Sequence, residues 1–459
     1  MRIHFLSNSL KTNSGFAIVT KNLALGLQKL GHQVSMTGMQ TSVTPEFSFG
    51  VEQLPLATNL DEMSQFQKNI MQSNPDVVIY VMEMYTDARN FAKIFPKTIV
   101  YCPSEGVGLP QYVVNDLNQI IKNGGKIVSQ CNYGQKQMLK AGVKETTVIY
   151  HGVNPDIFYP IDKKDLVNHS KYCYYHTEQG KESIGPRMLC KQDCYSCSKN
   201  INEQQNCPYY KEELITFTKY INDQWTETND MPLYKIQNEL KGKFIFLTVG
   251  QNHLLRKRFE RLLEAYSILI NESKQLKDKT HLHLHSNPQS PTGIDLLKVV
   301  NDLNIRNNVS FSYGTWRSSG FSENGLNILY NLSDIQVTAS SSEGYGLTSN
   351  EGFATGLPIV APDNTSFTEL IENTISNKTS SNNTIGPRGL LAKISDYHIV
   401  SDLTSRALVD VRDLSDKMKQ LFLKKNEREI YGDNAIKFVR LYTWDNIISD
   451  WSQLLYSMK

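Results

Sequence analysis

Two glutamates stand eight positions apart around a glycine-rich turn in the carboxyl-terminal half of the chain. Glu343 follows IQVTASS, which has the pattern of a strand, and Glu351 lies in LTSNEGFAT, which has the pattern of a short helix. The turn EGYG places backbone N–H groups at the start of that helix, where phosphate and other anions bind. Carboxylates repel phosphate, so both glutamates are expected to accept hydrogen bonds from neutral hydroxyl groups. The loop therefore suggests a nucleotide sugar as ligand, and a plain acidic helix cap is the alternative.

A pair of cations precedes another predicted helix. Arg256 and Lys257 come between the strand pattern FIFLTVG and the helical pattern FERLLEAYSILINES. Positive charges are unfavourable at the start of a helix unless an anion lies there. Two such cations can neutralise a departing diphosphate without a metal ion. The alternative is a solvated basic face that opens the helix.

The elements that carry these residues alternate regularly between short apolar strands and helices. This alternation predicts an α/β fold with parallel sheets that are covered on both faces. The pattern stops after about residue 160 and restarts near residue 241, which predicts two doubly wound halves with a ligand cleft between them. The predicted units are an amino-terminal domain at 1–160 that is completed by a carboxyl-terminal helix at 441–459, an inserted module at 161–240, and a carboxyl-terminal domain at 241–440.

The glutamate loop, with the ATGLPIVA that follows it, resembles the E-x7-E signature of retaining glycosyltransferases of family 4. Three further stretches resemble the family in the family's order, and the similarity covers the chain apart from the inserted module. They are SGFAIVTKNLALGLQKLGHQV (14–34), IYHGVNPDIFYP (149–160) and VGQNHLLRKRFERLLEAY (249–266). The resemblance implies the GT-B fold, in which two Rossmann-like domains face a cleft. It also implies transfer of a sugar from a nucleoside-diphosphate donor to an acceptor hydroxyl, with retention at the anomeric carbon. No D-x-D motif stands at the carboxyl end of a predicted core strand, so no catalytic metal is expected.

The resemblance also assigns roles to single residues. Lys257 and Arg256 match the positions that bind the donor diphosphate, Glu343 matches the one that faces the donor sugar, and Glu351 matches the one that binds the ribose. The remaining positions that match donor-binding residues are Gly15, Gly344, Tyr345, Gly346, Leu347 and Thr348.

Two positions depart from the family pattern. Many relatives have an arginine where Gln251 and Asn252 follow the strand, so the phosphate contact is expected to depend more on Arg256. Many relatives also have a histidine near the sugar, where this chain has Ser104 and Glu105. Glu105 is therefore a fourth candidate catalytic residue, and a surface carboxylate is the alternative.

The inserted module contains a compact group of cysteines. Clustered cysteines in a protein of the cytoplasm indicate a metal site before disulfides, and a small loop-rich module often needs structural zinc. The predicted ligands are Cys190, Cys194, Cys197 and Cys207, and Cys173 is a possible replacement. An iron–sulfur cluster, disulfides and free thiols are the alternatives. A second metal hypothesis concerns the alternating His281, His283 and His285, for which partly buried strand histidines are the favoured interpretation.

Composition limits the classes of partner. The 459 residues carry a net charge of +2, so no overall positive field favours nucleic acid. Neither a signal peptide nor an apolar run near the length of a membrane helix is found, which predicts a cytoplasmic protein, with peripheral membrane contact possible. The expected partner is a UDP- or GDP-sugar, and the acceptor is not identified. The competing functions are another GT-B enzyme, such as an epimerase or a phosphorylase, and a non-catalytic protein that binds a sugar nucleotide or nucleic acid.

Overall fold

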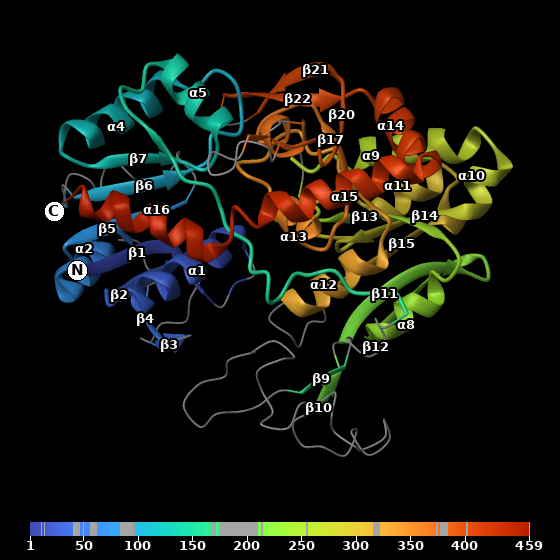
Figure 1. The fold of residues 1–459 in the computed structure, drawn as a ribbon, viewed down its shortest axis with the longest axis horizontal. Coiled ribbons are helices and arrows are strands. Elements are labelled where there is room, and N and C mark those ends of the chain that lie inside the picture. Colours follow the sequence, from blue (N-terminus) through green and yellow to red (C-terminus); the bar gives the residue numbers. More distant parts are fainter. Residues whose placement is uncertain are drawn as a thin grey trace.

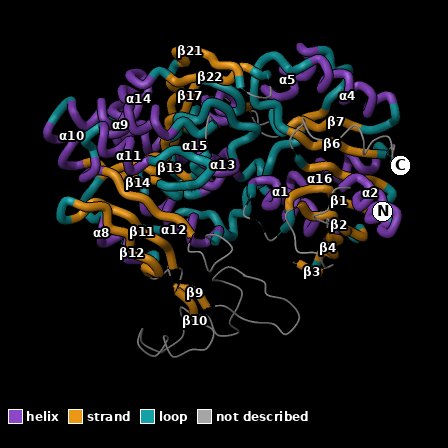
Figure 2. The backbone as a smooth tube through the Cα atoms, turned by 180° about the vertical axis from the view of Figure 1, so that it is seen from behind, coloured by secondary structure: helices purple, strands orange, loops and turns teal. Residues whose placement is uncertain are grey.

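The computed structural model consists of two α/β lobes that lie side by side (Figure 1), and the same arrangement is seen from behind in Figure 2. It describes residues 1–10, 12, 14–39, 46–48, 50–55, 62–82, 95, 97–164, 166, 171–173, 210–212, 214–253, 256–314, 322–372, 375–376, 384–400 and 403–458. No helix within these ranges is both long and apolar enough to cross a membrane.

The amino-terminal lobe contains an eight-stranded sheet in the order β3-β4-β2-β1-β5-β6-β7-β8. All neighbouring strands are parallel except β3 and β4. The strands are β1 (Arg2–Asn8), β2 (Gln33–Met39), β3 (Glu46–Ser48), β4 (Val51–Pro55), β5 (Val77–Val81), β6 (Thr98–Cys102), β7 (Lys126–Ser129) and β8 (Thr147–Val148). Every side chain of β5 and β6 is buried, which is why these segments are continuous apolar runs in the sequence.

Helices cover both faces of this sheet. They are α1 (Gly15–Lys29), α2 (Glu62–Ser73), α4 (Gln111–Lys122), α5 (Asn132–Ala141) and α16 (Trp444–Tyr456). One apolar core joins α1 and α16 to alternate residues of the central strands, and a second joins α2 and α4 to the residues between them. The last helix, α16, therefore packs on the amino-terminal lobe (Figure 1). Its Trp451 is fully buried in the core there.

The carboxyl-terminal lobe has a second eight-stranded sheet in the order β12-β11-β15-β14-β13-β16-β17-β20. Its strands are β11 (Leu214–Ile221), β12 (Gln224–Pro232), β13 (Phe244–Val249), β14 (Thr280–His285), β15 (Val309–Gly314), β16 (Ile335–Val337), β17 (Ile359–Pro362) and β20 (Gly389–Ala392). The strands from β15 to β20 are parallel to one another, whereas β11 is antiparallel to both of its neighbours.

The other elements of this part of the chain surround the sheet or extend from it. The helices are α8 (Tyr234–Glu239), α9 (Phe259–Asn271), α10 (Lys274–Lys279), α11 (Leu296–Asp302), α12 (Glu323–Leu332), α13 (Leu347–Ala354), α14 (Val411–Leu423) and α15 (Lys425–Val439), with a 3-10 turn η1 (Arg306–Asn308) and a π-helical turn η2 (Thr368–Glu372). Three two-stranded ribbons are formed by β9 (Lys171–Cys173) with β10 (Tyr210–Glu212), β18 (Ile375–Ser376) with β19 (Thr384–Ile385), and β21 (Ile394–Ile399) with β22 (Ser405–Val409).

Strands β11 and β12 correct one predicted boundary. The sequence predicts an inserted module at 161–240, but β11 within it pairs with β15 and so extends the carboxyl-terminal sheet. The reason is burial: Ile215 and Phe217 of β11 lie in the apolar core of this lobe, and Thr216 and Thr218 are buried as well, while Glu227 of β12 is exposed. The predicted metal ligands Cys190, Cys194, Cys197 and Cys207 lie outside the described residues, and Cys173 ends β9. The zinc site stays a prediction.

The two chain segments that connect the lobes run beside each other. The N–H of Val153 donates to the carbonyl of Tyr442 at 3.0 Å, and the N–H of Trp444 donates to the carbonyl of Val153 at 3.3 Å. Farther along the interface the lobes touch at Gly344, where a Cβ atom would lie 2.4 Å from Cβ of Pro103. A glycine is required there because any side chain would push the lobes apart.

Candidate active site

The two signature glutamates lie in the loop after β16 and in α13. Both are buried, at 8% and 6% exposure for Glu343 and Glu351. Gly346 occupies the cap position of α13 with φ of 100°, a conformation that glycine adopts without strain, and no side chain caps the helix. No side chain therefore satisfies the backbone N–H groups in the first turn of α13, and their contact with a ligand stays a prediction.

Glu343 is held by two cations that follow β13. Nζ of Lys257 donates to Oε1 of Glu343, and Nη1 of Arg256 lies 3.1 Å from Oε2. Burial would raise the pKa of Glu343, but the charges of Lys257 and Arg256 outweigh it and bring this pKa down to about 2. Glu343 is therefore ionised at neutral pH. The pKa of Lys257 is lowered, because burial disfavours its charge more than Glu343 favours it.

Serines of the loop fix both partners of this ion pair. The hydroxyl of Ser340 donates to Oε1 of Glu343 at 3.1 Å. The backbone carbonyl of Arg256 accepts a hydrogen bond from the N–H of Ser341 at 2.7 Å. The cations and the carboxylate therefore sit on segments that are tied together, which is the preorganisation that a charge-stabilising site requires.

Glu105 comes to the same place from the opposite lobe. Its Oε1 lies 3.6 Å from Nη1 of Arg256, and its Oε2 lies 3.4 Å from Nη1 of Arg406. The hydroxyl of Ser342 donates to Oε2 at 3.3 Å. The structure thus brings together Glu105, Arg256, Lys257 and Glu343, the four candidate catalytic residues, and adds Arg406.

Glu351 lies in a different environment, on the buried side of α13. The hydroxyl of Tyr330, in α12, donates to its Oε2 at 2.8 Å. Burial raises the pKa of Glu351 to about 7, and the hydrogen bond from Tyr330 only partly offsets this. This carboxyl group therefore changes protonation near neutral pH.

The remaining predicted donor-binding residues lie along the same interface. Gly15 begins α1, and a Cβ on it would lie 3.6 Å from the side chain of Leu347, at the first turn of α13. The ring of Tyr345 is buried against His151, with ring centres 4.8 Å apart, so only its backbone is suited to contact a ligand. Gly346, Leu347 and Thr348 form the helix start described above.

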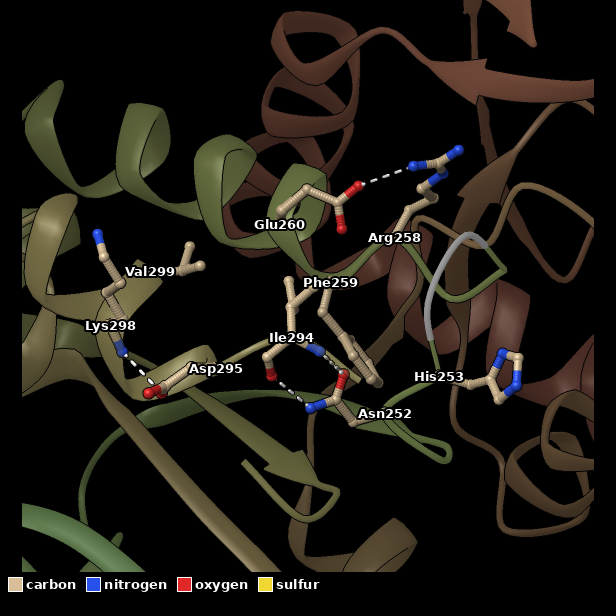
Figure 3. A pocket seen from close by; sticks show the side chains of 9 residues that line it. All are labelled: Asn252, His253, Arg258, Phe259, Glu260, Ile294, Asp295, Lys298 and Val299. Carbon is tan, nitrogen blue, oxygen red and sulfur yellow. Dashed lines mark hydrogen bonds and ion pairs between the residues drawn. The ribbon is translucent and has the colours of Figure 1, made fainter. Parts of the chain in front are cut away.

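The segment that lacks the family's arginine has a structural role. The side-chain amide of Asn252 donates to the carbonyl of Ile294 at 2.7 Å and accepts from its N–H at 3.2 Å, as Figure 3 shows. It also donates to the carbonyl of Asn287 at 3.2 Å. Asn252 therefore joins the loops that follow β13 and β14 and does not reach toward Glu343.

A cavity of about 350 Å³ lies beside these loops (Figure 3). It is adjacent to the cation segment, because Arg258 contributes to its wall. Apolar side chains form its inner part and charged groups lie around it. The lining residues are Asn252, His253, Arg258, Phe259, Glu260, Ile294, Asp295, Lys298 and Val299.

The strand histidines are structural. His281 and His283 share the hydroxyl of Ser310, at 2.8 and 2.9 Å, and His285 contacts Ser312 at 3.0 Å. Burial lowers the pKa of His281 to about 3 and that of His285 to about 4, so these rings are neutral. No group of three metal-binding side chains occurs among the residues that the structure describes.

One interlobe contact was not predicted from the sequence. Glu369, in η2, accepts hydrogen bonds from the backbone N–H groups of Asn132 and Tyr133 at 3.2 and 2.9 Å, at the first turn of α5. The hydroxyl of Tyr150 donates to the same carboxylate at 2.5 Å. A carboxylate of one lobe therefore occupies the positive end of a helix of the other lobe and stabilises this arrangement of the lobes.

Arg406 and Tyr330 were also missed. Arg406 is an isolated basic residue in SDLTSRALVD, and Tyr330 lies in an ordinary apolar helix pattern, ENGLNILYNL. Neither stretch carries a local signal for chemistry. Only the tertiary arrangement shows that one reaches Glu105 and the other Glu351.

Comparison with known protein families finds a match within the carboxyl-terminal lobe. Residues 243–396, which include Arg256, Lys257, Glu343 and Glu351, match the family described as glycosyl transferases group 1. About a third of the chain, within this lobe, is therefore similar to a group 1 glycosyltransferase domain. No curated protein sequence matches the chain.

Solved structures are similar to the whole chain. Sucrose-phosphate synthase from Thermosynechococcus elongatus is 14% identical with a TM-score of 0.63, and the match covers 99% of this chain and 98% of that one. HepE of Anabaena, in complex with UDP and glucose, is 11% identical with a TM-score of 0.61 and full coverage of both chains, 100% and 100%. WaaG, a glycosyltransferase of lipopolysaccharide biosynthesis, is 11% identical with a TM-score of 0.60, covering 98% of this chain and 99% of that one. These similarities confirm the predicted α/β fold of the GT-B type around the group 1 domain.

Proposed function

We propose that this protein is a retaining glycosyltransferase that moves a sugar from a nucleoside-diphosphate donor to an acceptor hydroxyl. The observation that carries the proposal is the pairing of Lys257 and Arg256 with Glu343 at the start of α13, inside a group 1 glycosyltransferase domain. A sugar nucleotide suits this site, because its diphosphate binds cations and its hydroxyl groups donate to carboxylates. UDP bound to HepE is consistent with a uridine nucleotide as donor.

The charges of the site suit the departure of a diphosphate. As the bond between the anomeric carbon and the diphosphate oxygen breaks, its electron pair goes to that oxygen. Lys257 and Arg256 would stabilise the growing negative charge, together with the N–H groups of α13. The acceptor oxygen bonds to the same face of the anomeric carbon, and its proton goes to the departing diphosphate. Glu343 would then face the sugar, whose ring becomes positively charged in the transition state.

Glu351 would accept hydrogen bonds from the ribose, and Glu105 from a hydroxyl of the donor sugar or the acceptor. Both roles require ionised carboxylates, which act only as acceptors. Glu105 is held by cations and Glu351 by the hydroxyl of Tyr330. The backbone of residues 344–348 and Gly15 would form the remaining contacts with the donor. Zinc in the cysteine-rich segment would serve structure rather than this reaction.

Binding and slow hydrolysis of UDP-, GDP- and ADP-sugars test this function. We expect one nucleotide class to bind the wild-type protein and to be hydrolysed slowly in the absence of acceptor. Lys425→Ala, which removes an exposed lysine on α15, is the control and should bind the same donor equally well. If no nucleotide sugar binds the wild-type protein, the ion pair at Glu343 is a structural feature and the proposal fails.

The raised pKa of Glu351 predicts that donor binding depends on pH. The ligand-free pKa is about 7, and hydroxyl donors from the ribose favour the ionised form, so binding must release a proton below this pH. Affinity for the UDP-sugar is therefore expected to fall by about tenfold from pH 8 to pH 6. Isothermal titration calorimetry at both pH values measures this change. In Glu351→Gln, which cannot ionise, affinity should be lower and independent of pH; an unchanged slope would contradict this role of Glu351.

A further inference from the structure

The β21–β22 ribbon connects the two lobes. The N–H of Val107 donates to the carbonyl of Ser405 at 3.0 Å, and the N–H of Ser405 donates back to the carbonyl of Val107 at 2.9 Å. The start of β22, which belongs to the carboxyl-terminal lobe, thus pairs with a loop of the amino-terminal lobe. Figure 1 shows the ribbon between α5 and α14. The match to the group 1 family ends at residue 396, so β22 lies beyond it.

Arg406 follows directly in β22 and is fixed from two directions. On one side, the next residue, Ala407, donates its N–H to the carbonyl of Ser341 at 3.3 Å, which ties β22 to the signature loop. On the other side, Nη1 of Arg406 lies 3.4 Å from Oε2 of Glu105. The side chain of Arg406 is only 13% exposed, so solvent screens this ion pair little.

Glu105 therefore has one arginine at each oxygen. Arg256 lies near Oε1 and Arg406 near Oε2. The two arginines differ in what else they do, because Arg256 also pairs with Glu343 and belongs to the proposed diphosphate site. When the diphosphate of the donor binds Arg256, Arg256 no longer pairs with Glu105. A partly buried carboxylate without a nearby cation destabilises the protein.

We propose that Arg406 is a positioning residue that holds Glu105 in place when the donor diphosphate engages Arg256. This inference rests on the proposed function. Without Arg406, Arg256 and Lys257 would be the cations that the described residues pair with Glu105 and Glu343, and they would also have to hold the diphosphate. Arg406 adds a positive charge that pairs with Glu105, so Arg256 is available to bind the diphosphate of the donor.

Removal of Arg406 is expected to act on both donor binding and turnover. In Arg406→Ala, Glu105 competes with the diphosphate for Arg256, so the KM for the donor should rise several-fold. Glu105 also loses its fixed position, so kcat should fall by about tenfold, less than the roughly 100-fold that a 1 Å misplacement can cost. Arg406→Lys keeps the charge and should recover part of the kcat, although it loses the planar guanidinium contact.

A double-mutant cycle with Glu105→Gln separates this role from a general structural one. If Arg406 acts through Glu105, Arg406→Ala should have little further effect on kcat in the Glu105→Gln background. Arg412→Ala is the matched control, since Arg412 lies on nearby α14, is 63% exposed and pairs only peripherally with Glu272. It should leave KM and kcat unchanged.

The experiment measures hydrolysis and transfer of the UDP-, GDP- or ADP-sugar that the wild-type protein binds, with thermal unfolding of each variant. Full additivity of the two substitutions, or no rescue by Arg406→Lys in a normally folded protein, would overturn the inference while leaving the glycosyltransferase proposal intact. If the wild-type protein binds none of these donors, the proposed function itself fails, and the role of Arg406 fails with it.

Discussion

Lys257→Ala is expected to lower the rate of sugar transfer or donor hydrolysis by about 100- to 1000-fold, the usual cost of removing one preorganised charge-stabilising group. Lys257 is the more deeply buried of the two cations, with 11% exposure against 34% for Arg256. Its charge therefore acts through a medium of low dielectric constant, where a nearby growing negative charge is stabilised more than in water. The steady-state kcat and KM for the donor measure the effect.

One further variant and one further measurement show whether this loss of activity reflects charge or folding. Lys257→Arg keeps a cation and should retain more activity than Lys257→Ala. Thermal unfolding is needed alongside, because Lys257→Ala leaves Glu343 with Arg256 as its remaining cation and is expected to lower stability as well. If Lys257→Ala folds and retains near wild-type kcat, the lysine is not part of the diphosphate site.

Most of the fold could be predicted because its strands are buried on both faces. Segments such as VVIYV and TIVYC are continuous apolar runs in the sequence and entirely buried strands, β5 and β6, in the structure. The exception is the pair β11 and β12. Their sequence, LITFTKYINDQWTETNDMP, contains many polar residues, because β12 is the edge strand of the sheet and exposes Gln224 and residues 227–229. Strand formation there depends on pairing with β15, which local sequence does not report.

The candidate site could be predicted only in part, because its residues lie far apart in the sequence and several of them belong to no motif. Glu343 and Lys257 are 86 positions apart, and only the order of the family's motifs linked them before the fold was known. Glu105 stands out in the sequence because many relatives have a histidine at this place, but its partner Arg406 belongs to no motif. Contacts between lobes, such as that of Glu369 with the start of α5, depend on how the lobes meet and have no local pattern.

Glu343→Gln is expected to have opposite effects on binding and on reaction. In the ligand-free protein, Glu343 occupies Lys257 and Arg256, so a diphosphate must displace this carboxylate from both cations. A neutral glutamine competes less, and UDP should bind several-fold more tightly than to the wild-type protein. Transfer should nevertheless fall by about 100-fold or more, because the negative charge next to the oxocarbenium-like sugar is lost.

Calorimetric titration with UDP and steady-state kinetics on the same preparation measure the two effects together. Glu429→Gln, which neutralises an exposed carboxylate on α15, is the control and should change neither quantity. Weaker UDP binding in Glu343→Gln would mean that Glu343 orients the cations for the diphosphate instead of competing with it. Unchanged transfer would remove Glu343 from the reaction. Tighter UDP binding with slower transfer is the combination expected only if Glu343 leaves the cations for the sugar when the donor binds.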